Sequence, residues 1–181
     1  MPDHRKARRS AGFQPPPTVS GEVLLEDGGD GRFRQMVHDL LSLETQMRAM
    51  RDHFGAELGT SGPGYAVVMA VAGLQGERGV AVNAVARHLH VSGPFVTAEA
   101  GKLVKSGLLA KQPNCQDRRG VLLTLAPEGE RRVMEIAPLV RAANDYFFGS
   151  LTAQEFAVLK GVAARLGKKS AGAFLHAARA L

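Results

Sequence analysis

Hydrophobic residues recur every three or four positions in several long stretches of this chain, and that spacing is typical of amphipathic helices. The pattern predicts helices over residues 32–57, 65–74, 128–148 and 152–166. Thr152 and Glu155 have the spacing of a capping box at the start of the last of these. We expect Gly167-Lys168-Lys169 to end that helix, and a short final helix to follow it.

Two shorter helices joined by a tight turn are predicted in the middle of the chain. Asn83 is expected to cap the first of them, and residues 90–93 are expected to form the turn, with Val91 buried inside it. Ser92 is a suitable N-cap for the second helix. Gly107 is expected to end that helix in a left-handed conformation.

The second of these helices has two different faces. Its apolar residues fall at helical spacing on the side predicted to be buried, and they are Val96, Ala100, Leu103 and Val104. The opposite side carries Phe95, Thr97, Ala98, Gly101, Lys102 and Lys105. If the apolar side packs in the core, the residues of the opposite side face outward and can contact a partner.

Two strand-like runs follow, over residues 108–111 and 121–125, and both are rich in branched apolar residues. The residues between them include Pro, Asn, Asp and Gly, which favour a turn. This predicts a hairpin with Arg118 and Arg119 at its tip. The run over residues 80–82 is expected to add a short strand to the same sheet.

A helix, a turn, a second helix and a hairpin in this order are the parts of a winged helix-turn-helix, which places side chains against duplex DNA. Arg118 and Arg119 suit contact with phosphates or insertion into a minor groove, and Asp117 would pair with a nearby arginine. A solvated turn with a surface ion pair is the alternative for this tip. The predicted fold class is mainly α, with a small β-hairpin wing.

These residues resemble the MarR family of winged-helix transcription regulators. The resemblance spans about residues 32 to 166 and rests on the order of the motifs VARHLHVS (85–92), VT (96–97), LVKSGLL (103–109), DRRG (117–120) and LTLAPEG (123–129). It implies a bacterial, dimeric, sequence-specific DNA-binding protein, often a repressor that a small ligand releases. It also implies a helical dimerisation region formed by the N- and C-terminal helices.

The expected DNA contacts combine the outer face of the second helix, its N-cap and the hairpin tip. They are Ser92, Phe95, Thr97, Ala98, Lys102, Lys105, Asp117, Arg118 and Arg119. Glu99 departs from the family pattern, because a carboxylate is unusual so near a DNA groove. It either accepts a hydrogen bond from a cytosine amino group or turns inward to pair with a lysine, and we prefer the inward pair.

The terminal helices have more apolar surface than one small domain can cover, so a partner subunit is expected to cover it. A two-fold dimer would place two recognition helices roughly 34–36 Å apart on a pseudo-palindromic operator. The expected organisation is a basic, Pro-rich, disordered arm over residues 1–28 and one MarR-like domain over 29–181. Within that domain, the winged helix is expected at 64–126 and dimerisation helices at 32–57 and 128–181.

Methionine and aromatic residues suggest a binding site for a small apolar or aromatic effector. The residues selected for it are Met36, Tyr65 and Met69, because flexible methionines line adaptable pockets as well as cores. The alternatives are a ligand-independent or architectural DNA-binding protein, or a protein-interaction module or enzyme that reuses the winged helix. The sequence shows no catalytic arrangement and no metal-ligand spacing, so no enzyme activity, cofactor or metal is expected.

Composition agrees with a DNA partner. The formal net charge is +6 and the isoelectric point is near 9.9, which suits binding to a polyanion. No apolar run is long enough to span a membrane, and the basic N-terminus is not followed by the hydrophobic segment of a signal peptide. The single cysteine fits a reducing compartment, so a cytoplasmic, nucleoid-associated bacterial protein is expected.

That cysteine, Cys115, lies among the cations of the predicted hairpin tip. Neighbouring cations lower a thiol pKa, so oxidation of Cys115 could disturb DNA contact and make the protein a redox sensor. A lone cysteine in a turn is more often incidental, and both interpretations stay open from the sequence.

Overall fold

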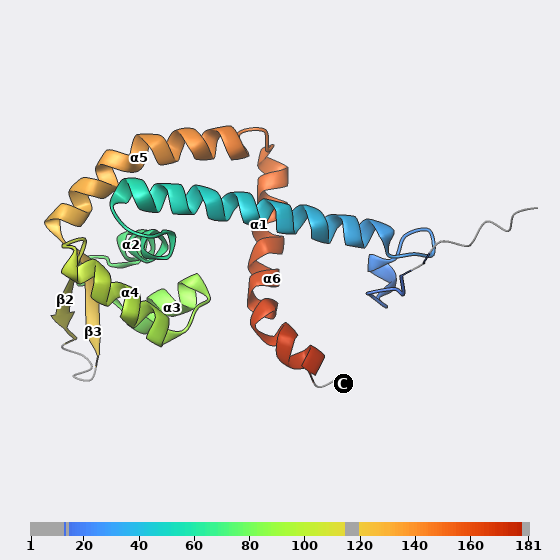
Figure 1. Ribbon diagram of the computed structural model, residues 1–181, viewed down its shortest axis with the longest axis horizontal. Helices are drawn as coiled ribbons and strands as arrows, with labels where there is room; N and C mark the ends of the chain where they lie inside the picture. Colours follow the sequence, from blue (N-terminus) through green and yellow to red (C-terminus); the bar gives the residue numbers. More distant parts are fainter. Residues whose placement is uncertain (1–12, 14, 115–119, 179–181) are drawn as a thin grey trace, which may run out of the picture. The chain divides into compact units, whose positions relative to one another are not determined.

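The computed structural model describes residues 13, 15–114 and 120–178. Within them, the chain forms six α-helices, one 3-10 helix and one small antiparallel sheet (Figure 1). This confirms the predicted mainly α fold class with a β-hairpin wing. The chain divides into two compact units that meet between Met47 and Arg48, inside the first long helix.

The first unit contains a short 3-10 helix, η1 (Glu22–Leu24), and the first part of helix α1 (Gly31–Leu58). Asp30 precedes α1 and accepts hydrogen bonds from the Thr18 backbone N–H at 2.6 Å, the Thr18 hydroxyl at 2.8 Å and Arg34 Nε at 2.9 Å. Arg34 Nη2 also donates to the Pro16 carbonyl at 2.7 Å. The Arg34 guanidinium, with the two Thr18 donors, holds the pKa of Asp30 well below its usual range. Pro16 and Thr18, which belong to the predicted arm, are therefore hydrogen-bonded to the start of α1.

The second unit contains a lobe, residues 62–126, made of three helices and a sheet. The helices are α2 (Gly62–Leu74), α3 (Val82–Leu89) and α4 (Gly93–Lys105). The strands are β1 (Val80–Ala81), β2 (Leu109–Pro113) and β3 (Val121–Leu125). Their order is β1-β3-β2, with Leu109 opposite Leu125 and Pro113 opposite Val121. The expected short strand is confirmed at Val80–Ala81, while Val82 begins α3.

The core of this unit is built mainly by aliphatic residues from the lobe, with Leu58 from the end of α1 and Ile136 from the helix that follows the lobe. Its largest fully buried side chains are Leu58, Val67, Val68, Val71, Val85, Val96, Leu103, Leu109 and Leu123. Each fully buried side chain of this kind contributes about 1.5–3 kcal/mol relative to an exposed one. The packing therefore holds the three short helices and the sheet in one arrangement.

Two more long helices complete the second unit: α5 (Pro127–Phe148) and α6 (Ala153–Ala178). The Thr152–Glu155 capping box is confirmed, because the Glu155 N–H donates to Thr152 Oγ1 at 3.3 Å and the Thr152 N–H donates to Glu155 Oε2 at 2.8 Å. The predicted break at Gly167-Lys168-Lys169 is wrong, since α6 continues through it. One glycine costs only about 1 kcal/mol in a helix, and the alanines and lysines around it favour the helical state.

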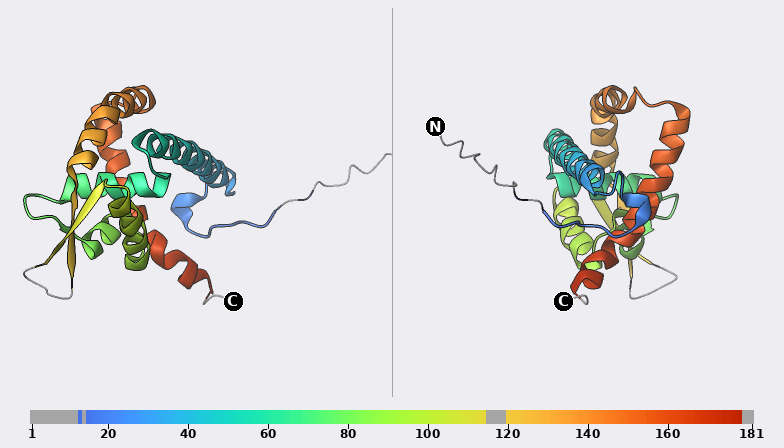
Figure 2. Two further views of the ribbon diagram at one scale, coloured as in Figure 1. Left: turned by 60° about the vertical axis from the view of Figure 1, so that its left-hand side comes forward. Right: turned by 90° about the vertical axis from the view of Figure 1, so that its right-hand side faces the viewer.

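Helix α5 is hydrogen-bonded to the C-terminal end of α1. Arg132 donates from Nη2 to the Glu57 carbonyl at 2.8 Å and from Nε to the Leu58 carbonyl at 3.4 Å, and so caps that end of α1. In Figure 1 and in the left view of Figure 2, α5 runs along one side of the lobe while α3 and α4 lie on the other. The outer side of α4 is therefore not covered by α5.

The first turn of α5 approaches the lobe so closely that position 129 requires glycine. A Cβ at Gly129 would overlap the Leu108 carbonyl oxygen and lie 2.9 Å from its carbon. This carbonyl is already held by a 3.1 Å hydrogen bond from the Ala126 N–H, and backbone atoms cannot move aside as a side-chain tip can.

We expect Gly129→Ala to lower the free energy of unfolding by about 3 kcal/mol, the upper end of the range for overpacking. Gly73→Ala in α2 is the matched control, because a Cβ at Gly73 would have no neighbouring atom within 4 Å and alanine is the better helix former. Chemical denaturation of both variants measures the difference. Equal midpoints for the two would contradict this close approach.

Candidate nucleic-acid interface

The turn between α3 and α4 sets the direction of α4. His90 takes the left-handed conformation, with φ of 54°, and ends α3. The Val91 N–H then donates to the Ala86 carbonyl at 3.0 Å, which turns the chain out of the helix. Ser92 caps α4 as predicted, since its Oγ accepts from the Phe95 N–H at 3.3 Å.

Two details of this turn differ from the sequence-based expectation. Val91 is 38% exposed and not buried, because His90 is the residue that makes the left-handed turn and Val91 follows at the surface. Asn83 is not the N-cap of α3, since the helix begins at Val82 directly after strand β1. Pairing of Val80 and Ala81 with β3 carries the chain into the helix, and the Ala81 cap position has no side-chain hydrogen bond.

The inner face of α4 is anchored as predicted. Val96, Ala100 and Leu103 are buried in the core, and Val104 packs against it. Gly107 lies just after the end of α4. Its φ of 75° is the left-handed conformation expected there. These contacts leave little freedom for α4 to rotate about its axis.

The outer face of α4 carries the predicted contact residues. Thr97, Ala98 and Lys105 are exposed, and Phe95 is 37% exposed beside them. The Thr97 hydroxyl donates to the Gly93 carbonyl at 3.0 Å, so its oxygen remains available as an acceptor. The Lys102 side chain is 71% exposed. This face combines an aromatic ring, small residues and two ammonium groups.

Glu99 turns inward, as preferred from the sequence. The residue is only 7% exposed, and its Oε1 accepts a hydrogen bond from Lys102 Nζ at 2.6 Å. A carboxylate at the edge of the core is stabilised there by the paired cation, because an unpaired buried charge would be costly. The pair joins a buried carboxylate and an exposed ammonium one helical turn apart, at the edge between the inner and outer faces of α4.

The wing is a two-stranded hairpin whose strands start from the core and extend outward (Figure 2). Leu109 and Leu123 are buried at its base, while Lys111, Gln112 and Val121 are exposed further out. The Asn114 N–H donates to the Gly120 carbonyl at 3.3 Å where the strands end. Cys115, Asp117, Arg118 and Arg119 lie outside the described residues, so their predicted roles stay predictions.

Two glutamines that attach the sheet to the helices were not selected from the sequence. Gln75 Oε1 accepts from the Leu125 N–H at 2.7 Å, and Gln112 Nε2 donates to the Arg78 carbonyl at 2.8 Å. The partners lie far apart in sequence, and a single glutamine has no pattern that would reveal such a bond. Together they fix the wing relative to α2 and the turn before β1.

A second candidate site is a cavity of about 310 Å³ between α2 and α5. Its apolar wall is formed by Met69, Val133, Ile136, Ala137 and Val140. Arg141, Asn144 and Asp145 supply polar groups to the same cavity. An apolar wall with a few polar groups is the usual composition of a small-molecule site.

The three residues proposed for an effector site have different surroundings. Met69 lines the α2–α5 cavity. Tyr65 packs against the core, with its ring centroid 5.6 Å from that of Phe54, and burial raises the pKa of its phenol. Met36 lies on α1 in the first unit and is 46% exposed. The α5 residues of the cavity were not named from the sequence, because their apolar spacing also fits ordinary core packing.

The described part of the chain contains no cluster of three or more His, Cys, Asp or Glu residues arranged to hold a metal ion. None of its described helices is long and apolar enough to cross a membrane.

Comparison with known proteins supports the fold derived above. No protein-family model matches the chain. A search of curated proteins finds the HTH-type transcriptional repressor MdtR of Bacillus subtilis (strain 168), which is 24% identical over 135 residues, 74% of this chain and 87% of MdtR.

Several solved structures share the fold. A MarR protein from Peptoclostridium difficile has a TM-score of 0.64 and 18% identity, over 83% of this chain and 95% of that one. CouR from Rhodococcus jostii RHA1, solved bound to p-coumaroyl-CoA, has a TM-score of 0.63 and 19% identity, over 72% and 91% of the two chains. MepR of S. aureus, solved as a DNA complex, has a TM-score of 0.59 and 17% identity, over 71% and 93%.

These solved structures share the fold of most of this chain. The motifs that resemble the MarR family, over residues 85–129, lie mostly in the lobe of residues 62–126. The chain therefore has the winged helix-turn-helix fold of the MarR-family transcription regulators.

Proposed function

We propose that the protein is a DNA-binding transcription regulator that inserts the outer face of α4 into the major groove of duplex DNA. The observation that carries this proposal is the anchoring of α4: its inner face is buried, its start is capped by Ser92, and its outer face is exposed. A recognition helix needs this rigidity, because base contacts depend on a fixed register. The likeness of the fold to MepR, solved with DNA, supports the same assignment.

The predicted contact residues other than Ala98 fall into several roles in this proposal. Lys102 and Lys105 supply cations, Thr97 supplies a hydroxyl oxygen that accepts, and Phe95 contacts the methyl group of thymine. Ser92 contributes at the start of α4, where helix N–H groups favour a phosphate. Arg118 and Arg119 on the wing bind phosphates or a minor groove, and Asp117 holds them in place.

We also propose that the regulator is a homodimer formed through its long helices. Several large apolar side chains of α6 are exposed in the single subunit: Phe156 is 58% exposed, Leu159 44% and Leu166 55%. Helix α1 shows the same feature, with Leu40 at 46% and Met47 at 47%. A two-fold partner that covers such faces would place two recognition helices about one DNA turn apart.

Selection from a random duplex library tests the function directly. The full-length protein is expected to enrich one pseudo-palindromic sequence and to bind it at least a thousandfold more tightly than a scrambled duplex, the lower end for specific binders. Footprinting on genomic DNA then identifies the regulated genes. Failure to bind any duplex at low salt would overturn the proposal and favour a protein-interaction role for the winged helix.

The α2–α5 cavity supports the further proposal that a small apolar or aromatic effector controls operator release. The likeness in fold to CouR, solved bound to p-coumaroyl-CoA, supports a ligand site, and the similarity to the repressor MdtR supports a repressor role. A ligand shifts DNA binding only if it prefers the state that does not bind DNA.

A ligand that weakens operator affinity tenfold is expected to lose tenfold of its own affinity when the operator is saturating, a coupling of about 1.4 kcal/mol. Calorimetry of a candidate aromatic acid with and without operator measures both constants. Met69→Ala should lower the affinity of the protein for the ligand and leave its affinity for DNA unchanged. Equal ligand affinities in the two titrations would indicate a ligand-independent regulator.

A further inference from the structure

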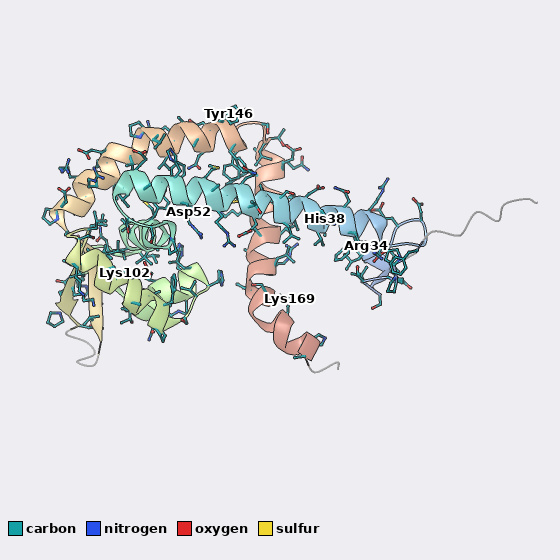
Figure 3. All side chains as sticks on the ribbon, viewed as in Figure 1. Arg34, His38, Asp52, Lys102, Tyr146 and Lys169 are labelled. Atoms are coloured by element: carbon teal, nitrogen blue, oxygen red, sulfur yellow. The ribbon has the colours of Figure 1, made fainter. Side chains whose placement is uncertain are left out.

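The buried end of Glu99 and the exposed end of Lys102 form an ion pair on the proposed recognition helix. The Glu99 side chain is 9% exposed and that of Lys102 is 71% exposed, with Nζ and Oε1 2.6 Å apart. Phe95, Glu99 and Lys102 follow one another at i, i+4 and i+7, so they share one edge of α4. Figure 3 labels Lys102 on this helix.

The pair changes what Lys102 can do at a DNA surface. A lysine ammonium has three N–H donors, and Glu99 takes one of them, which leaves two for acceptors in the groove. The carboxylate also cancels the charge of the ammonium locally. A free lysine on a flexible stem would instead move to the nearest phosphate, a contact that carries no sequence information.

The position of Glu99 explains why it can hold the ammonium in place. Its neighbours on the inner side of α4, Val96 and Leu103, are fully or almost fully buried, so α4 itself does not move to adjust the pair. An anionic group at this edge also repels phosphate oxygens that approach Lys102. Both effects favour acceptors on base edges over acceptors on the backbone.

We infer that Glu99 is a positioning residue for DNA sequence selectivity: it holds Lys102 so that the ammonium contacts base-edge acceptors, such as guanine O6 and N7, and not phosphates. This inference rests on the proposed DNA-binding function. It assigns to the acidic residue of the recognition helix a role in choosing the sequence, without direct contact between Glu99 and a base.

Glu99→Gln tests the inference, because glutamine keeps the shape and removes the charge. Affinity is measured for the duplex selected by the unmodified protein and for a scrambled duplex of the same composition. The selectivity ratio is expected to fall about tenfold, within the range for removal of one base contact. Binding to the scrambled duplex should become tighter, with a salt slope steeper by about 0.9 as Lys102 gains a phosphate.

Three further variants separate this role from its alternatives. Glu130→Gln changes net charge equally at an exposed position of α5 and should leave the selectivity ratio unchanged. Lys102→Ala should itself reduce selectivity, and Glu99→Gln added to it should have no further effect. Melting temperatures within a few degrees of the unmodified protein show that the fold is retained.

The outcomes are distinct. The inference is supported if Glu99→Gln lowers the selectivity ratio of the unmodified protein but does not lower that of the Lys102→Ala variant. The same tenfold loss in the Lys102→Ala background would overturn it and show that Glu99 contacts a base itself. An unchanged ratio in a folded Glu99→Gln variant that still binds the selected duplex would overturn the inference alone. No binding of the unmodified protein to any duplex would overturn the proposed function and the inference with it.

Discussion

Substitution of aspartate for both Phe156 and Leu159 is expected to convert the proposed dimer into a monomer and to weaken operator binding on the order of a hundredfold or more. The two side chains lie one turn apart on α6 and are 58% and 44% exposed in the single subunit. Burial of each against a partner would contribute about 1.5–3 kcal/mol, and a buried aspartate would oppose association instead. A monomer loses the high effective concentration of the second recognition helix.

Light scattering and binding to the selected duplex measure these two effects. The matched control is the Ala157→Asp, Ala164→Asp double variant, which adds the same charge at exposed positions on a different side of α6. It should remain dimeric and bind the operator. A monomeric unmodified protein, or a dimeric double aspartate variant, would show that α6 is not the dimer interface. Truncation before Leu151 should likewise give aggregates or weakly binding monomers.

Removal of both wing arginines is expected to have the second large effect. Arg118→Ala with Arg119→Ala should weaken operator binding about a hundredfold or more, because each charge-assisted hydrogen bond contributes about 1.5–3 kcal/mol. Arg119→Ala alone should have a larger effect than Arg118→Ala alone. The dependence of log affinity on log salt should flatten by about 0.9 for each phosphate that is no longer neutralised.

The control for the wing is Lys160→Ala with Arg165→Ala, which removes the same charge from exposed positions on α6. It should change the salt slope little. Gel filtration checks that both proteins keep the oligomeric state of the unmodified chain. An unchanged affinity and salt slope in the wing variant would remove the wing from the DNA contact and leave α4 as its sole element.

Local signals predicted the main elements well. The periodic apolar residues of α1 and α5, the N-cap at Ser92 and the left-handed Gly107 all have their expected structure. Each depends on residues within one or two turns of one another, so the sequence contains the whole cause. The inward turn of Glu99 was also predictable, because Lys102 lies one helical turn away.

Two of the errors arose where distant residues decide the outcome, and one where neighbouring residues outweigh a single glycine. Pairing of β1 with β3 moved the start of α3 to Val82, ahead of the good N-cap residue Asn83. Gly167 failed to break α6 because the residues on both sides favour a helix strongly enough to outweigh one glycine. The Thr18–Asp30–Arg34 hydrogen bonds joined part of the predicted arm to α1 through partners up to 12 residues apart from Asp30.

The sequence by itself determined the order of helix, turn, helix and hairpin, because spacing, capping and turn residues act over a few positions. It also determined the residues that α4 can present outward, since burial of Val96, Ala100 and Leu103 leaves only the opposite face. Only the tertiary structure decided that Gly129 must lie against the Leu108 carbonyl, that Gln75 and Gln112 hold the wing, and that α5 forms a cavity with Met69. Those contacts join segments that no local pattern connects, and they form only when packing of the core brings the segments together.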